Sequence, residues 1–468
     1  MKKGKGKKAK GKGREILALL LPFAFCLLPF FCGWAASAQG EALVKRLEGA
    51  AALVRDKRIE EAEREIASVL KIAPEAAGAL NLLGTIRAGQ GRLDEAESLF
   101  LRAVRSDPQF AGVHMNLAYL YLLRNQPEKT AASLKEVLRL EPENTDAARK
   151  LARLLLSQNR ADECIELIEG LQRTGQTTPA PLVVLLGDAY RRKGDARRAE
   201  ESYLRALEAG GENAEALVGL AQLSQAKGDA RSVAFYLARA RSVSASSPEL
   251  LYAVALISLK AGLQEDARRS LVKALEVKPE EPALLYLLGV AWLRKPDLFE
   301  SEQVFRRLLK LRPDHAPAQL YLGYVLLKQK RFAEAREFLE KSVRADDAAP
   351  EGSYYLALIA QEQKEDARAV EILEKVVGRF PGFAHARVAL GASYLRLKNY
   401  TRAREELELA LKLNPDDRKA HYQLALLYAR LKEPERAQEE LRIVERLRDK
   451  DSAQPDTDDD ISAPASPR

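Results

Sequence analysis

Cysteine and histidine, the side chains behind most metal sites and much nucleophilic catalysis, are scarce in this sequence. It has three cysteines and four histidines in 468 residues. Cys26 and Cys32 lie in a hydrophobic leader, so removal of the leader would leave only Cys164 and no internal disulfide. The histidines are His114, His315, His385 and His421, and none of them has a metal-ligand spacing to another His, to a Cys or to an acidic pair. We therefore predict that the protein binds no metal.

Signatures of catalysis and of cofactor binding are also missing. The sequence has no phosphate-binding loop, no nucleophile elbow and no zinc-protease signature. The repeats described below run to about residue 451, which leaves no stretch of chain for a catalytic domain. We predict that the protein is not an enzyme and has no cofactor.

Excess positive charge is confined to the start of the chain. The formal net charge of +8 is of the kind that attracts nucleic acid. However, residues 1–38 hold eight basic residues and one acidic residue, so 67 basic and 66 acidic residues remain, a balance of +1. A nearly neutral body excludes general polyanion binding, and we predict no nucleic-acid partner.

Residues 1–38 have the pattern of an export leader. A stretch of alternating Lys and Gly precedes an uncharged run from Ile16 to Gly40, and Ala36-Ser37-Ala38 is a small-x-small cleavage pattern. We expect a signal peptide cleaved after Ala38. The run is also long enough to remain as an N-terminal membrane anchor, with residues 16–38 in the bilayer. Both alternatives place the rest of the chain outside the cytoplasm.

A 34-residue pattern recurs along the chain, and residues 384–417 show it most completely. A Leu-Gly pair, an aromatic residue, two small residues and a proline occupy places 7, 8, 11, 20, 27 and 32: Leu390, Gly391, Tyr394, Ala403, Ala410 and Pro415. Small residues at places 8, 20 and 27 let two antiparallel helices approach closely, and the proline ends the second helix. The pattern resembles that of the tetratricopeptide repeat family.

The resemblance implies an all-α fold. We expect an α-solenoid, a right-handed superhelix of about twelve helix-turn-helix units, in which each unit buries its apolar face against its neighbours. The array is predicted to span residues 43–451, with units that start at residues 43, 77, 111, 145, 180, 214, 248, 282, 316, 350, 384 and 418.

Three segments depart from the repeat. Residues 39–42 are expected to be a short linker between the leader and the array. Residues 173–181 are rich in Thr, Gly and Pro and form a candidate hinge. Residues 452–468 are rich in Asp, Ser, Ala and Pro, so we predict a disordered acidic tail.

Members of the family bind partners in a concave groove lined by the first helix of each unit, and the resemblance implies such a groove here. In the C-terminal half, places 5 and 9 are mostly aromatic or aliphatic and place 13 is usually basic. The predicted groove residues are Tyr252, Leu256, Lys260, Tyr286, Val290, Arg294, Leu320, Tyr324, Lys328, Tyr354, Leu358, Arg396, Tyr422, Leu426 and Arg430, with Val388 and Ala392 at equivalent places. A channel of this kind suits a peptide with apolar anchors and some acidic residues.

Two observations leave this interpretation open. The same places in the N-terminal half are more polar, with Asn81, Arg149, Arg153, Asp188 and Arg192. A tyrosine at place 5 can also pack between helices, and a cation at place 13 can complement the negative end of its helix. The groove residues therefore have a structural alternative.

These features predict a non-catalytic scaffold, periplasmic or anchored in the inner membrane, that binds protein or peptide partners. Envelope assembly, secretion and exopolysaccharide machinery are the expected settings, by resemblance to exported repeat proteins. An accessory subunit that binds polysaccharide and a membrane-tethered structural spacer are the alternatives.

Overall fold

The computed structural model describes residues 38–173, 175, 178–244, 246–293, 297–346 and 349–452. Almost all of the predicted leader and the predicted tail lie outside these ranges, as do Arg294 and part of the predicted hinge. Within the described ranges the regular structure is helical, with twenty-four helices and no strand. None of these helices combines the length and the apolar character needed to cross a membrane.

The chain divides into two compact units, one up to Leu223 and one from Ser224, with the division inside α12. The helices up to the division are α2 (Ala38–Arg55), α3 (Ile59–Ile72), α4 (Ala77–Gly89), α5 (Leu93–Ser106), α6 (Ala111–Leu123), α7 (Pro127–Leu140), α8 (Thr145–Ser157), α9 (Ala161–Arg173), α10 (Ala180–Arg192), α11 (Ala196–Gly210) and α12 (Ala214–Ala226).

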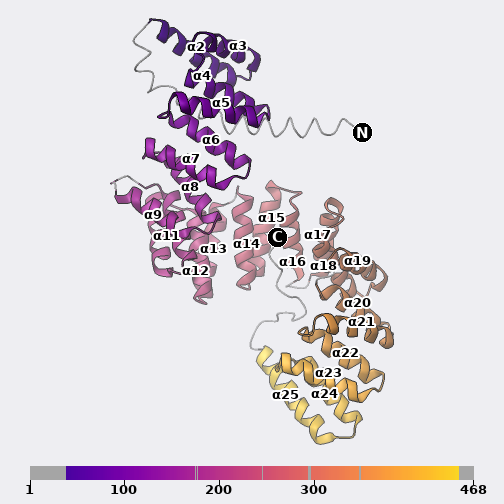
Figure 1. Cartoon of the computed structure of the whole chain (residues 1–468). Coiled ribbons are helices and arrows are strands. Elements are labelled where there is room, and N and C mark those ends of the chain that lie inside the picture. Colours follow the sequence, from indigo (N-terminus) through magenta and orange to yellow (C-terminus); the bar gives the residue numbers. More distant parts are fainter. Residues whose placement is uncertain are drawn as a thin grey trace, which may run out of the picture. The chain divides into compact units, whose positions relative to one another are not determined.

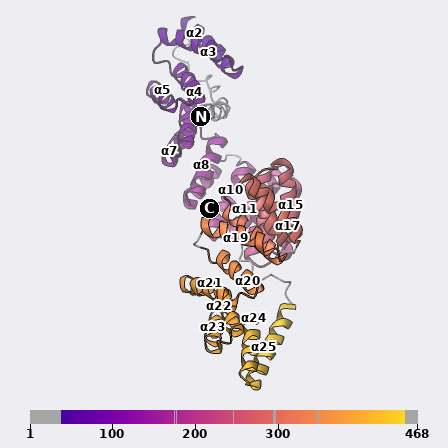
Figure 2. The same ribbon diagram turned by 90° about the vertical axis from the view of Figure 1, so that its right-hand side faces the viewer.

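The helices of the second unit are α13 (Ala230–Val243), α14 (Pro248–Lys260), α15 (Gln264–Val277), α16 (Pro282–Leu293), α17 (Leu298–Leu311), α18 (Ala316–Lys328), α19 (Phe332–Ala345), α20 (Glu351–Glu362), α21 (Asp366–Arg379), α22 (Ala384–Arg396), α23 (Tyr400–Leu413), α24 (Arg418–Arg430) and α25 (Pro434–Ser452). Within each unit, successive helices lie side by side in antiparallel pairs that stack on the next pair (Figure 1, Figure 2), the arrangement of an α-solenoid.

The helices follow the 34-residue period closely. Ten of the twelve predicted unit starts coincide with the first residue of a helix, from α4 at Ala77 to α24 at Arg418. The two exceptions are α20, which begins at Glu351, and α2, which begins at Ala38 and includes the residues 39–42 expected as a linker. The array ends at Ser452, one residue beyond the predicted limit.

The turn inside each pair has one recurring backbone feature. Wherever it is described, the fifteenth residue of a unit has φ between 54° and 81°: Lys57, Gly91, Asn125, Asn159, Gly194, Gly228, Gly262, Lys330, Lys364, Lys398 and Lys432. This left-handed residue ends the first helix of the pair. Four units use glycine, which adopts the conformation without steric cost, and two use asparagine, which tolerates it. The five units with lysine accept a strained backbone.

Close contact between the paired helices accounts for the glycine at place 8. A Cβ atom at Gly84 would lie 2.6 Å from the ring of Phe100, and one at Gly187 equally close to the ring of Tyr203. Gly289 has the same relation to Phe305. The large side chain at place 24 thus fills the space that the glycine leaves, and these three rings are fully buried.

Candidate functional site

The predicted groove residues differ widely in exposure. Four of them have less than a tenth of their surface exposed: Tyr286, Val290, Tyr324 and Tyr354. Tyr252, Leu256, Leu320 and Leu358 are half-buried, and Lys260, Lys328, Arg396, Tyr422, Leu426 and Arg430 are exposed. Arg294 lies outside the described residues. The tyrosine row is therefore accessible at its C-terminal end and mostly internal elsewhere.

Aromatic packing between neighbouring repeats explains why Tyr286 is buried. Its ring centroid lies 6.0 Å from that of Tyr321, in the following unit, and 5.4 Å from that of His315, the residue just before that unit. Burial, and then the neighbouring Tyr321 hydroxyl, raise the pKa of Tyr286 well above its usual value. Packing between helices, the structural alternative for this place, thus applies to Tyr286.

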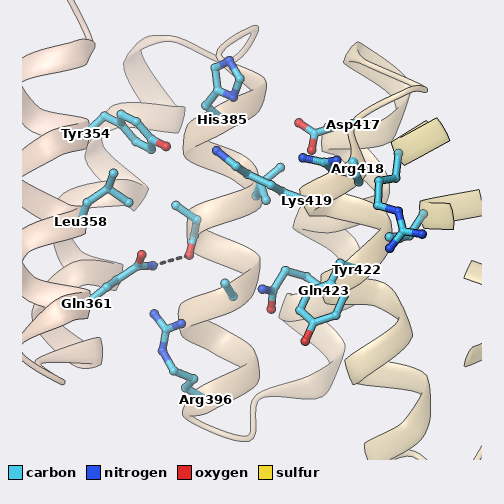
Figure 3. Close-up of a pocket in the computed structure, with 15 residues that line it drawn as sticks. Tyr354, Leu358, Gln361, His385, Arg396, Asp417, Arg418, Lys419, Tyr422 and Gln423 are labelled. Carbon is cyan, nitrogen blue, oxygen red and sulfur yellow. Dashed lines mark hydrogen bonds between the residues drawn. The ribbon is translucent and has the colours of Figure 1, made fainter. Parts of the chain in front are cut away.

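A pocket of about 480 Å³ lies at the C-terminal end of the second unit. It is formed by three successive first helices, α20, α22 and α24, whose labelled side chains appear in Figure 3, and by the final helix α25. Its lining comprises Tyr354, Leu358, Gln361, His385, Val388, Ala389, Ala392, Arg396, Asp417, Arg418, Lys419, Tyr422, Gln423, Val444 and Arg448. Six of these occupy the groove places identified in the sequence: Tyr354, Leu358, Val388, Ala392, Arg396 and Tyr422.

The floor of the pocket is apolar and held in place by hydrogen bonds. Leu358 comes from α20, while Val388, Ala389 and Ala392 come from one face of α22. The side-chain Nε2 of Gln361 donates to the carbonyl oxygen of Ala389 and to Oγ of Ser393, both at 2.7 Å (Figure 3 shows the side chain). These bonds join α20 to α22 at the pocket.

The rim of the pocket is cationic. Arg396, Arg418, Lys419 and Arg448 line it, against a single carboxylate, Asp417. That carboxylate is buried and accepts from the backbone N–H of Ala420 at 2.9 Å, so it caps the N-terminus of α24. Nε of Arg396 donates to Asp366 at 2.6 Å. In Figure 3 Tyr354 and Lys419 point toward one another across the pocket.

Val444 and Arg448 of α25 form a wall that the sequence interpretation missed. That interpretation assigned the groove to first helices only, whereas α25 is a second helix. It has 19 residues, compared with 14 in α23, so its last turns extend beside the start of α24. An apolar stripe was visible in the sequence at Ala437, Leu441, Val444 and Leu447. A final helix longer than the usual repeat length would have placed Val444 and Arg448 beside the groove.

Partly buried polar contacts fix α25 against α24. Nδ1 of His421 lies 2.5 Å from a carboxylate oxygen of Glu440, and Nε2 lies 3.0 Å from the carbonyl oxygen of Pro415. Ala437 and Leu447 of α25 are buried as well. The wall of the pocket is thus anchored to the helix that carries Tyr422.

The polar residues predicted in the N-terminal half are largely engaged within the array. Asn81 is buried and accepts from Nδ2 of Asn116 at 2.8 Å. The Tyr203 hydroxyl donates to Asp188 at 2.8 Å, and Arg149 donates to Asp146 at 2.7 Å. Arg192 donates to the carbonyl oxygen of Leu156, and Arg153 is exposed.

The part of the chain that the structure describes shows neither a metal-binding cluster nor a reactive cysteine. There, no group of three or more His, Cys, Asp or Glu side chains could hold a metal ion. Cys164 is a buried free thiol. Burial, followed by the negative charge of Asp188, raises its pKa to about 12, which disfavours the reactive thiolate.

Known proteins are similar to parts of this chain. The cellulose synthase operon protein C of Pseudomonas fluorescens (strain SBW25) is 28% identical over 152 residues, which make up 31% of this chain and 12% of that protein. The chain therefore matches only a small part of that relative's length.

Two solved structures, among others, resemble it in fold. The APC/C hetero-tetramer Cut9-Hcn1 is 16% identical with a TM-score of 0.42, and the match covers 88% of this chain and 94% of the matched chain. YrrB, described as a tetratricopeptide repeat protein with an unusual peptide-binding site, is 20% identical with a TM-score of 0.32, covering 39% of this chain and 94% of its own.

Family models account for most of the chain. One tetratricopeptide repeat model matches residues 47–110, 184–245, 252–310 and 300–350, and a second matches residues 121–182 and 360–418. These segments fall on the helix pairs of both units. Proteins with such repeats are typically non-catalytic and bind peptide or protein partners. The chain belongs to the tetratricopeptide repeat family and has the architecture of a protein–protein interaction scaffold.

Proposed function

We propose that this protein is a scaffold outside the cytoplasm that binds a peptide segment of a partner protein in the pocket of α20, α22, α24 and α25. The observation that carries the proposal is the combination of an apolar floor with a cationic rim in one pocket of about 480 Å³. A volume of this size accommodates a few side chains. The matching ligand is a segment with an aliphatic or aromatic anchor beside acidic residues.

The accessible tyrosine supports this choice of ligand. Tyr422 is 47% exposed and belongs to the lining, so a ligand can bury the remainder of its ring. Aromatic side chains of this kind are enriched among residues that dominate binding energy. Acidic ligand residues would meet Arg396, Arg418 and Lys419, where charge-assisted hydrogen bonds add orientation.

Site-specific photo-crosslinking in the native cell envelope tests this proposal. Probes replace Tyr422 and Arg418, both exposed and both in the lining, and a control probe replaces Arg442, which is exposed on α25 outside the lining. A discrete protein captured by both pocket probes and not by the control supports the proposal. Equal background at all three positions would overturn it.

The location is part of the proposal and rests on the leader pattern of residues 1–38. The N-terminal sequence of the purified protein tests it. A protein that begins at Gln39 has been cleaved by signal peptidase. An intact leader in a membrane fraction indicates the anchored form, with the repeats outside the cytoplasm. An intact leader in the cytosolic fraction would contradict both forms.

The similarity to cellulose synthase operon protein C supports an exopolysaccharide setting, and the cationic rim favours one alternative ligand, an anionic polysaccharide. Tyr422 could stack on a sugar ring. Polyanion binding weakens steeply with salt, whereas an apolar anchor does not. Glycan adducts at the Tyr422 probe, lost at high ionic strength, would favour the polysaccharide over the peptide.

A further inference from the structure

The chain itself contains a segment that matches the chemistry of the pocket. Outside the described residues, positions 456 to 461 read Asp-Thr-Asp-Asp-Asp-Ile, which places four carboxylates directly before an aliphatic residue. The pocket presents the complementary set, with the basic residues Arg418, Lys419 and Arg448 on the rim and aliphatic side chains on the floor. The segment therefore has the composition proposed for the partner peptide.

The final helix ends close to the pocket. Arg448 lines the pocket, and α25 ends four residues later at Ser452. That last turn rises about 6 Å along the helix axis. The four residue-to-residue steps from Ser452 to Asp456 span at most about 14 Å when extended. Asp456 and the aspartates after it are therefore within reach of the rim.

We propose that the segment from Asp456 to Ile461 docks in the pocket of its own chain and competes with the partner. This inference rests on the proposed function of that pocket and adds its regulation. The aspartates pair with Arg418, Lys419 and Arg448, and Ile461 takes the place of the partner's apolar anchor on the floor formed by Leu358 and Val388.

Tethering explains how a weak interaction can regulate the pocket. Ion pairs at an exposed rim each contribute little, so the segment added as a separate peptide should bind weakly. A short tether supplies an effective concentration on the order of 1 mM. If the separate peptide binds with Kd of about 0.1 mM, the tethered segment weakens any competing ligand about tenfold. A partner with several anchors can still displace it.

The test compares three full-length proteins: the native chain, a neutral-tail variant and a charge control. The neutral-tail variant carries D456N, D458N, D459N and D460N. The control removes the same charge from exposed positions distant in sequence, with E60Q, E276Q, E280Q and E281Q. The probe is a fluorescent synthetic peptide with the sequence of residues 453–468.

We expect the probe to bind the neutral-tail variant about ten times more tightly than either the native chain or the control. Equal affinity for all three proteins, or no binding to the neutral-tail variant, would overturn the inference. Carbodiimide cross-linking of the native monomer adds a direct readout. It should join Lys419, and not the exposed Lys432 at the opposite end of α24, to an aspartate between 456 and 460.

Failure of this inference can be distinguished from failure of the proposed function. The Tyr422 photo-probe is placed in the neutral-tail variant, and capture of a partner is measured alongside peptide binding. If a partner is captured but the peptide does not bind, docking of the segment is excluded and the scaffold function is retained. If the peptide binds but no partner is captured, docking of the segment is supported and the proposed partner site is excluded.

Discussion

A Cβ atom at Gly391 would lie 2.6 Å from Cγ of Leu407 and 3.2 Å from the carbonyl oxygen of Ala403. Leu407 belongs to the second helix of the same repeat, so this contact brings α22 and α23 together behind the pocket. Gly323 has the same relation to Leu339. A glycine inside a helix costs about 1 kcal/mol relative to alanine. Close packing offsets that cost at these positions.

Gly391→Ala should therefore destabilise the protein although it improves helix propensity. The added methyl group has to displace Leu407 or the backbone, and overpacking of this kind costs about 1–3 kcal/mol. Gly378→Ala in α21 is the matched control, because its Cβ would meet nothing within 4 Å. We expect a higher denaturant midpoint for Gly378→Ala and a lower one for Gly391→Ala. Equal midpoints would contradict the packing account.

Substitution of Gly262 tests the effect of backbone conformation on stability without an effect of packing. Its φ is 75°, and an added Cβ would also meet nothing within 4 Å. Gly262→Ala should cost about 1 kcal/mol through the left-handed conformation alone, and Gly262→Asn should cost less because asparagine tolerates that region. Denaturant unfolding of the two variants measures the difference. An alanine variant as stable as the native protein would show that the turn can relax.

Removal of the contact between His421 and Glu440 should loosen the wall of the pocket. His421→Ala leaves the partly buried carboxylate of Glu440 without its partner at 2.5 Å, a loss of about 1–3 kcal/mol. Amide hydrogen exchange should accelerate between residues 434 and 448 more than in α20. Arg442→Ala, at an exposed position of the same helix, serves as the control. Unchanged exchange in α25 would contradict this anchoring role.

Cys164 should resist alkylation while the repeats are folded. Its pKa is raised to about 12, so the thiolate is rare at pH 8 and becomes abundant only as the pH approaches that value. We expect slow labelling at pH 8, detected by peptide mass mapping, and fast labelling in denaturant. Fast labelling of the folded protein at pH 8 would mean that the thiol is accessible and acidic.

Most of the fold could be predicted from the sequence because the repeat has a fixed length. Glycine and proline at set places mark the close contacts and the helix ends, so helix starts such as Ala77 and Ala384 follow from the period. The left-handed turn was recognisable at Gly262 but not at Lys398, because lysine has no preference for φ near 62°.

The site was less predictable, because exposure depends on position in the array. Tyr286 and Tyr422 share the same repeat place, yet they are 8% and 47% exposed. Tyr286 packs on Tyr321 of the next unit. Tyr422 lies on α24, which belongs to the last helix pair of the described array. Val444 and Arg448 depend on the length of α25, which the repeat pattern does not specify.

The affinity of the captured partner segment for three proteins tests the account most directly: the native chain, Tyr422→Ala and Leu397→Ala. Tyr422 and Leu397 are 47% and 46% exposed, but only Tyr422 lines the pocket. We predict that Tyr422→Ala weakens binding at least about tenfold, as expected for a central aromatic anchor, while Leu397→Ala leaves it unchanged and both variants remain folded. Equal affinity for Tyr422→Ala and the native protein would contradict the assignment of the pocket as the partner site.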